Sequence, residues 1–118
     1  MALGRARTGA ATEPTVETAG TDNDLTAPQV VKFDTPAKPV YISVPAGFTA
    51  SIRVKVNADA DNDFDNDSDD DGPGYHVVAA GATKELSEQG CLSLERVSFV
   101  TQDAGDDLDD VSIVGWPG

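Results

Sequence analysis

The sequence predicts an all-β fold, a single antiparallel β-sandwich of jelly-roll type that carries an extended N-terminal arm. Short apolar runs rich in valine recur along the chain, and β-branched side chains favour strands over helices. Proline, glycine and aspartate separate these runs, as turn residues do in all-β domains. One run also alternates apolar and polar residues at a period of two, which is the spacing of a strand with one buried face.

That alternating run covers residues 50–58. Ile52 and Val54 belong to its apolar set, whereas Arg53 and Lys55 belong to the polar set. We therefore expect one buried face and one solvent-facing face. The two bases on the solvent-facing face are expected to anchor the acidic run that follows them, through partly screened charge pairing.

Further strands are predicted from similar apolar runs at 30–33, 40–44, 75–79, 91–101 and 111–116. Pro36 and Pro39 have no backbone N–H to donate, which places the region around them at a sheet edge or at the start of a strand. The apolar residues of the run at 91–101 change parity partway along it. A bulge near Glu95 and Arg96 is expected, because one extra residue restores the phase.

Residues 1–28 are rich in Ala, Thr, Gly and Glu and carry few large apolar side chains. A segment of this composition cannot bury enough surface to fold alone, so we expect an arm that orders only against other molecules. Arg5 and Arg7 in this arm are expected to bind acidic or carbonyl groups of a partner. Residues 29–118 form the predicted sandwich domain, with an acidic loop inserted at 59–72.

The chain contains 21 acidic and 8 basic residues, which gives a formal net charge of −13. Nucleic acid and anionic membranes are excluded as partners on this basis, because both carry negative charge. A basic protein surface, a divalent cation or a salty medium would each reduce the self-repulsion. Neither a signal peptide nor a membrane span is predicted. Cys91 is the single cysteine, so no disulfide forms within the chain, and we expect a buried, inert thiol.

The inserted acidic run, DADNDFDNDSDDDG, suits a hard cation in its spacing. Asp67, Asp69, Asp71 and Gly72 match the opening D-x-D-x-D-G of a calcium loop. The closing glutamate of such a loop falls on Val78, and no helices flank the run. The run therefore resembles, over its first half, the Asp-rich calcium repeats of dockerins and thrombospondin type 3 modules. Calcium binding and a solvated acidic loop both remain open, and no cofactor is required.

No catalytic constellation is predicted, and we expect that the chain is not an enzyme. His76 is the only histidine and has no nucleophile or second ligand at a recognisable spacing, so we expect a packed or surface strand residue. Phosphate loops, dinucleotide fingerprints and zinc spacings are absent from the sequence. Trp116 either caps the core at the end of the last strand or anchors a contact with another subunit.

The run GYHVVAAGATKELSEQGCLSLERVSFVTQDAGDDLDDVSIVGW resembles the ending of small bacteriophage virion proteins of the capsid decoration or cement type. The shared features are a strand, an A-G-x-T corner, a leucine, a strand that ends in R-V and a terminal apolar strand. Here they fall at Ala80, Gly81, Thr83, Leu86, Arg96 with Val97, and 113–116. With the region 40–56, the resemblance covers about the last two thirds of the chain, and the acidic loop departs from it as an insertion.

This resemblance implies a β-sandwich that decorates a capsid, commonly as a trimer, with its terminal arm lying over neighbouring subunits. Its partners would be the major capsid protein or other virion proteins, and its location the capsid surface. Two other functions remain open: a secreted calcium-binding adhesion or carbohydrate-binding β-module, and a phage tail or fibre adaptor.

Overall fold

The computed structural model of the chain describes residues 10–60, 64, 70–72, 74–88 and 92–117. Within these residues, seven strands form one antiparallel sheet, with two short 3-10 turns, so the all-β prediction is confirmed. The strands are β1 (Thr15–Thr18), β2 (Gln29–Ser43), β3 (Ile52–Val56), β4 (Tyr75–Val78), β5 (Thr83–Glu85), β6 (Leu94–Val100) and β7 (Ser112–Pro117). The turns are η2 (Asn57–Asp59) and η3 (Leu108–Asp110). No helix in the described part of the chain is long and apolar enough to cross a membrane.

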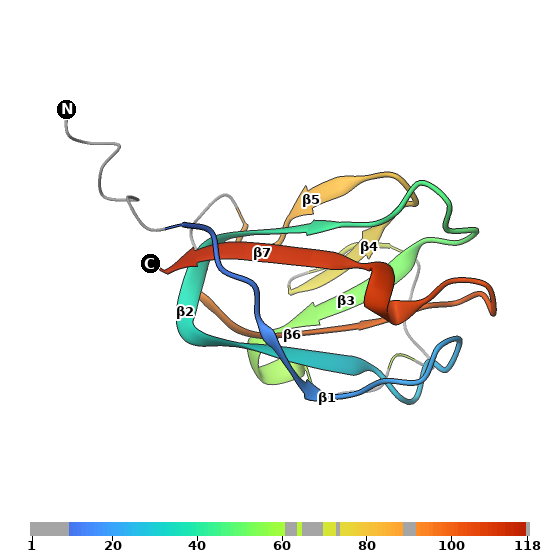
Figure 1. The fold of residues 1–118 in the computed structure, drawn as a ribbon, viewed down its shortest axis with the longest axis horizontal. Coiled ribbons are helices and arrows are strands. Elements are labelled where there is room, and N and C mark those ends of the chain that lie inside the picture. The colour runs from blue at the N-terminus through green and yellow to red at the C-terminus, as the bar shows by residue number, and fades with distance from the viewer. Residues whose placement is uncertain (1–9, 61–63, 65–69, 73, 89–91, 118) are drawn as a thin grey trace.

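The long strand β2 belongs to both halves of the sheet. Its first part pairs with β1 and β6, and β6 continues the sheet to β3 and β4. Its last part pairs with β7 on one edge and β5 on the other. Figure 1 shows β2 turning sharply between these two parts, which brings β7 across from β6. The sheet is therefore folded on itself at β2.

Two prolines explain where β2 changes partners. The pairing with β6 becomes irregular between Lys32 and Ala37, and the pairing with β7 becomes irregular between Ala37 and Val40. Pro36 and Pro39 lie in these intervals, and a proline cannot donate a ladder hydrogen bond. The sequence separates this region into two strands at 30–33 and 40–44, whereas the structure joins them into one bent strand.

The core lies inside the fold of the sheet. Side chains from both parts of β2 enter it, and Phe33 and Ile42 are among the largest that are fully buried. Gly115 of β7 lies against the bend: a Cβ atom at this position would sit 3.0 Å from the Ala37 Cβ and 3.2 Å from Phe33 Cε1. A glycine therefore lets β7 approach β2 closely. Because the pairing is one continuous sheet, the jelly-roll arrangement of two sheets stays a prediction.

The bulge expected near Glu95 and Arg96 is found at that level of the sheet, but the extra residues belong to the partner strand. Lys32 pairs with Arg96 and Ala37 pairs with Leu94, so five steps along β2 match two steps along β6. The change of apolar parity within 91–101 therefore reflects the bend of β2, which the sequence of β6 alone does not reveal.

Residues 12–28 differ from the expected arm, because they find partners within their own chain. The backbone N–H of Asn23 donates to the Thr101 hydroxyl at 2.8 Å, and that of Leu108 donates to an Asp22 carboxylate oxygen at 3.0 Å. Gly20 packs so closely that an added Cβ would lie 2.4 Å from the Gln29 nitrogen. Composition did not reveal this order, since hydrogen-bonded pairing uses backbone groups that every residue carries.

We call residues 12–18 the strap, because they join the two halves of the folded sheet. Thr12 exchanges two backbone hydrogen bonds with Gly115 of β7, at 2.7 and 2.9 Å. β1 then pairs with the first part of β2. Arg96 on β6 donates to both carboxylate oxygens of Glu17, which adds a third attachment. The strap is visible in Figure 1 as the blue segment that crosses β7 and descends to β2.

Candidate functional site

The outer surface of β2 and β7 carries an aromatic pair. Along β7, Ile113 and Gly115 are buried, whereas Val114 and Trp116 between them are half-buried and point outward. Along β2, Tyr41 alternates in the same way with its buried neighbours, and it pairs directly with Val114. We call Tyr41, Val114 and Trp116 the aromatic face.

The two rings of the aromatic face meet edge to face. Their centroids lie 6.3 Å apart and their planes are 89° from parallel. This geometry is favourable for aromatic pairs, and it leaves both residues partly accessible. Tyrosine and tryptophan are the residues most enriched at binding hot spots, because they supply a large contact area at a small cost in conformational entropy. Trp116, one of the predicted partner-binding residues, thus lies on a surface whose composition suits protein contact.

Perpendicular rings also bear on the sugar-binding alternative. Stacking of a pyranose ring uses an aromatic ring that lies flat and open on the surface. In the aromatic face, one ring presents its edge to the other, so the pair forms no flat platform. The two rings together therefore do not form one coplanar platform for a sugar.

A second feature is the attachment of the acidic segment, residues 59–72, to the sheet. Phe64 is fully buried within this segment. Its backbone N–H donates to the Leu25 carbonyl at 2.7 Å, and its carbonyl accepts from the Arg53 guanidinium at 3.0 Å. The Lys55 ammonium lies 4.7 Å from the centre of its ring, and the Tyr75 ring lies 6.4 Å away. One aromatic side chain thus attaches the acidic segment to β3 and β4 at residue 64.

This attachment corrects the predicted solvent-facing side of β3. Arg53 is only 8% exposed, although the alternating pattern places it on the wet face. Phe64 covers that face from outside, so both faces of β3 are occupied. The two bases do anchor the acidic segment, as expected, but the structure shows them acting through the carbonyl and the ring of Phe64. The sequence signal that could have predicted this contact is the single aromatic residue, Phe64, inside the acidic run.

Of the three predicted calcium ligands, the structure describes Asp71 alone. One of its carboxylate oxygens accepts from the Lys84 ammonium at 2.8 Å, and the other accepts from the Val77 backbone N–H at 2.7 Å. These two hydrogen bonds lower the pKa of the Asp71 carboxyl. Both oxygens therefore have protein donors.

Asp67 and Asp69 lie outside the described residues. Within the residues that are described, no group of three or more His, Cys, Asp or Glu side chains is placed to hold a metal ion. A calcium site in the acidic segment stays a prediction.

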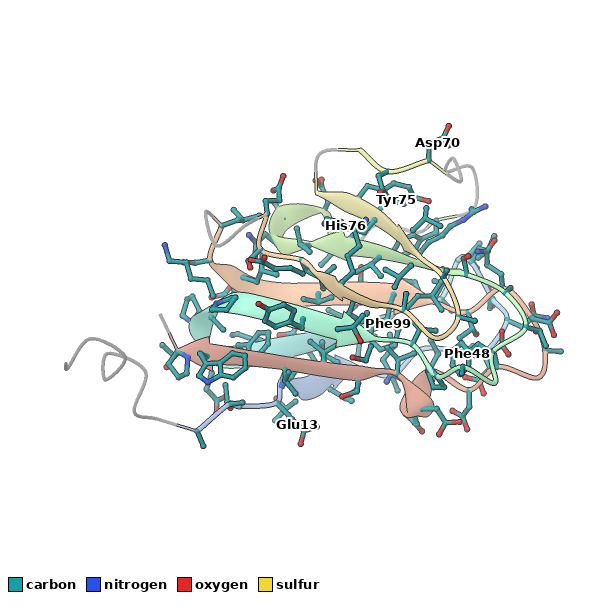
Figure 2. The ribbon with its side chains drawn as sticks, turned by 90° about the horizontal axis from the view of Figure 1, so that it is seen from above. Glu13, Phe48, Asp70, Tyr75, His76 and Phe99 are labelled. Carbon is teal, nitrogen blue, oxygen red and sulfur yellow. The ribbon has the colours of Figure 1, made fainter. Side chains whose placement is uncertain are left out.

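His76 lies on β4 with its imidazole buried, at 7% exposure. Figure 2 shows it beside Tyr75, on the side of the molecule that carries Asp70. Its Nε2 atom has no hydrogen-bond partner among the described residues. Burial lowers the pKa of His76, and the charge of Lys84 lowers it further, while Asp71 and Glu88 act in the opposite direction. This imidazole is a packed strand residue, as expected.

The lowered pKa of His76 predicts a loss of stability at mildly acidic pH. The unfolded chain takes up a proton near the ordinary histidine value of 6.5, whereas the folded chain resists it. The stabilising effect is therefore fully present above pH 6.5 and declines as the pH falls below that value, by at most about 1.4 kcal/mol per pH unit. Urea unfolding at pH 8 and pH 5.5 measures this decline.

His76→Gln provides the control, because His76 is the only histidine in the chain. In this variant the decline between pH 8 and pH 5.5 should disappear. An equal decline in both proteins would show that the imidazole is not responsible.

The remaining predicted contact residues, Arg5 and Arg7, lie outside the described residues, as does Cys91. No protein-family model, curated protein sequence or solved structure matches this chain.

Proposed function

We propose that the chain is a non-catalytic structural subunit that binds a protein surface, and that it acts as a decoration or cement subunit on a bacteriophage capsid. The aromatic face is the observation that supports this proposal most directly. It sets two large aromatic side chains, partly accessible, on a rigid part of the sheet beside buried neighbours. Such anchors supply most of the energy in many protein interfaces.

The charge and the fold agree with this proposal. A net charge of −13 keeps copies of the chain from associating without specificity and favours a partner surface with basic groups. A folded sheet that acts as a sandwich of jelly-roll type is a rigid body, which limits the entropy lost on binding. The resemblance of residues 74–116 to small virion proteins supports the major capsid protein as the partner and a trimer as the form that binds.

Trp116→Ala is expected to remove the chain from the particle. Loss of a central interface tryptophan weakens binding by about thirtyfold or more, since such hot spots contribute at least about 2 kcal/mol. The measurement is the copy number of the chain in purified particles, determined by quantitative mass spectrometry, with circular dichroism to confirm that the free variant is folded.

Val114→Ala provides a second test of the aromatic face, and Val77→Ala is its matched control. Both remove the same atoms from a half-buried valine, but only Val114 belongs to the aromatic face. Binding should fall for Val114→Ala and stay unchanged for Val77→Ala. Wild-type incorporation of folded Trp116→Ala would contradict the proposed surface.

The two alternative functions predict different results in these experiments. A tail or fibre adaptor would be found in tail fractions and be missing from isolated heads. A calcium-binding adhesion module would show no particle association, and sub-millimolar calcium would raise its melting temperature. The contact of Asp71 with Lys84 makes this last outcome the less expected one.

A further inference from the structure

A groove remains where the strap does not cover the open side of the folded sheet. It has a volume of about 150 Å³ and lies between the strap and the start of β7. Apolar side chains form its floor, and Figure 2 shows Phe99 inside the folded sheet and Glu13 at the surface. The apolar lining residues are Pro14, Val16, Val31, Phe99, Leu108, Val111 and Ile113. A cavity of this size and composition accepts one apolar group as large as benzene.

The rim of the groove is distinctive in two ways. Val16 is 54% exposed, and it is the one large apolar side chain that is exposed among the described residues. Glu13 and Asp109 also line the groove, and the Asp109 carboxylate accepts a hydrogen bond from the Gln29 amide at 3.3 Å. An occupant that matches this rim combines an apolar side chain with cationic groups.

The edge of β7 provides backbone groups along the same groove. Gly115 directs its N–H and C=O away from β2, toward Thr12 of the strap. Residues two apart in a strand direct these groups to the same side, so Ile113 also directs them to the outer edge. An extended segment in the groove can therefore continue the pairing that Thr12 begins.

We infer that this groove binds residues 1–9 of a second copy of the chain, in an extended conformation. The segment reads MALGRARTG. In an extended chain alternate residues share a face, so Met1, Leu3, Arg5 and Arg7 point one way and the small residues point the other. One face of the segment thus provides an apolar side chain for the floor, with Arg5 and Arg7 for the carboxylates at the rim.

The direction of the strap favours a second copy over the chain's own segment. Thr12 pairs antiparallel with Gly115, so the chain before Thr12 runs toward the end of β7. The groove lies at the opposite end, where β7 begins. Residues 1–9 of the same chain would have to reverse direction at once to reach it, whereas a segment from another copy needs no reversal. This inference is independent of any capsid partner.

Leu3→Asp is expected to weaken self-association by about tenfold or more, because it places a charge where an apolar side chain is buried. Ala2→Asp is the matched control: it adds the same charge at the neighbouring position but on the opposite face, and it should change the dissociation constant by less than about twofold. Sedimentation equilibrium on the free full-length chain measures both. Equal effects of the two substitutions, or a wild-type chain that is monomeric throughout, would overturn the inference.

Cross-linking identifies which chain supplies the segment. In a Cys91→Ser background, one preparation carries Leu3→Cys and the other carries Val16→Cys. On oxidation, the mixture should give a disulfide-linked pair of unlike chains. A single chain with both substitutions that cross-links only to itself at high dilution would assign the groove to its own segment and overturn the inference. Because neither experiment contains particles, failure here leaves the aromatic face untouched.

Discussion

Phe64→Ala is expected to lower the free energy of unfolding by about 3–5 kcal/mol, the usual cost of truncating a fully buried phenylalanine. The ring contacts the Lys55 ammonium and lies beside the Tyr75 ring, so its removal leaves the outer side of β3 uncovered. For a domain of this size the melting temperature should fall by more than about 10 °C. Thermal unfolding followed by circular dichroism measures this change.

Phe64→Ala should also weaken the structure of two particular segments. The Phe64 backbone N–H is bonded to the Leu25 carbonyl, so hydrogen exchange should accelerate in the N-terminal segment around residue 25 as well as in the acidic segment. Phe64→Leu, which keeps an apolar side chain of smaller volume, should lose less than half as much stability. If Phe64→Ala costs less than about 1 kcal/mol, the acidic segment is not anchored by this residue.

Asp106→Ala is expected to cost about 2–4 kcal/mol, since it removes a carboxylate that holds two loops together. Asp106 is 2% exposed and accepts from the Thr49 N–H at 2.9 Å, from the Thr49 hydroxyl at 3.2 Å and from the Ala50 N–H at 3.2 Å. Hydrogen bonds to charged groups contribute more than neutral ones, and donors that lose a buried acceptor are costly. Urea unfolding at pH 7 measures the difference.

Two substitutions of aspartate by asparagine in the same loop test the role of Asp106. Asp106→Asn keeps one carbonyl oxygen but turns an NH₂ group toward the donors, so it should also destabilise the fold. Asp103→Asn changes the charge equally at an exposed position, and it should have little effect. A similar response of both variants would indicate a general effect of charge rather than the hydrogen bonds of Asp106.

The strands were largely predictable from the sequence because their signal is local. The run of β3 alternates regularly, the run at 75–79 contains β4, and the run at 111–116 covers β7 except for its last residue. The extent of β2 was not predictable, because its two parts are joined by contacts with four different strands. The short strands β1 and β5 were also missed, since they contain few apolar side chains and form through backbone pairing.

The candidate site was predictable only in part, because its contacts join residues that are far apart in the sequence. Trp116 stood out as the single tryptophan, and both of its predicted roles depended on what lay beside it. Its contact with Tyr41 joins positions far apart in the sequence through the pairing of β2 with β7. Similarly, Phe64 could not be assigned a partner until the side of β3 that it covers was known.

The single bent strand at the centre of the molecule limits how this protein can be divided. Both halves of the sheet include part of β2. If one half is removed, the other therefore loses part of the strand with which it pairs. Fragments separated near Pro36 would each expose half of one shared interior. Because both halves share β2, a break near Pro36 is expected to unfold both of them, and insertions are expected to be tolerated better in loops outside this strand than within it.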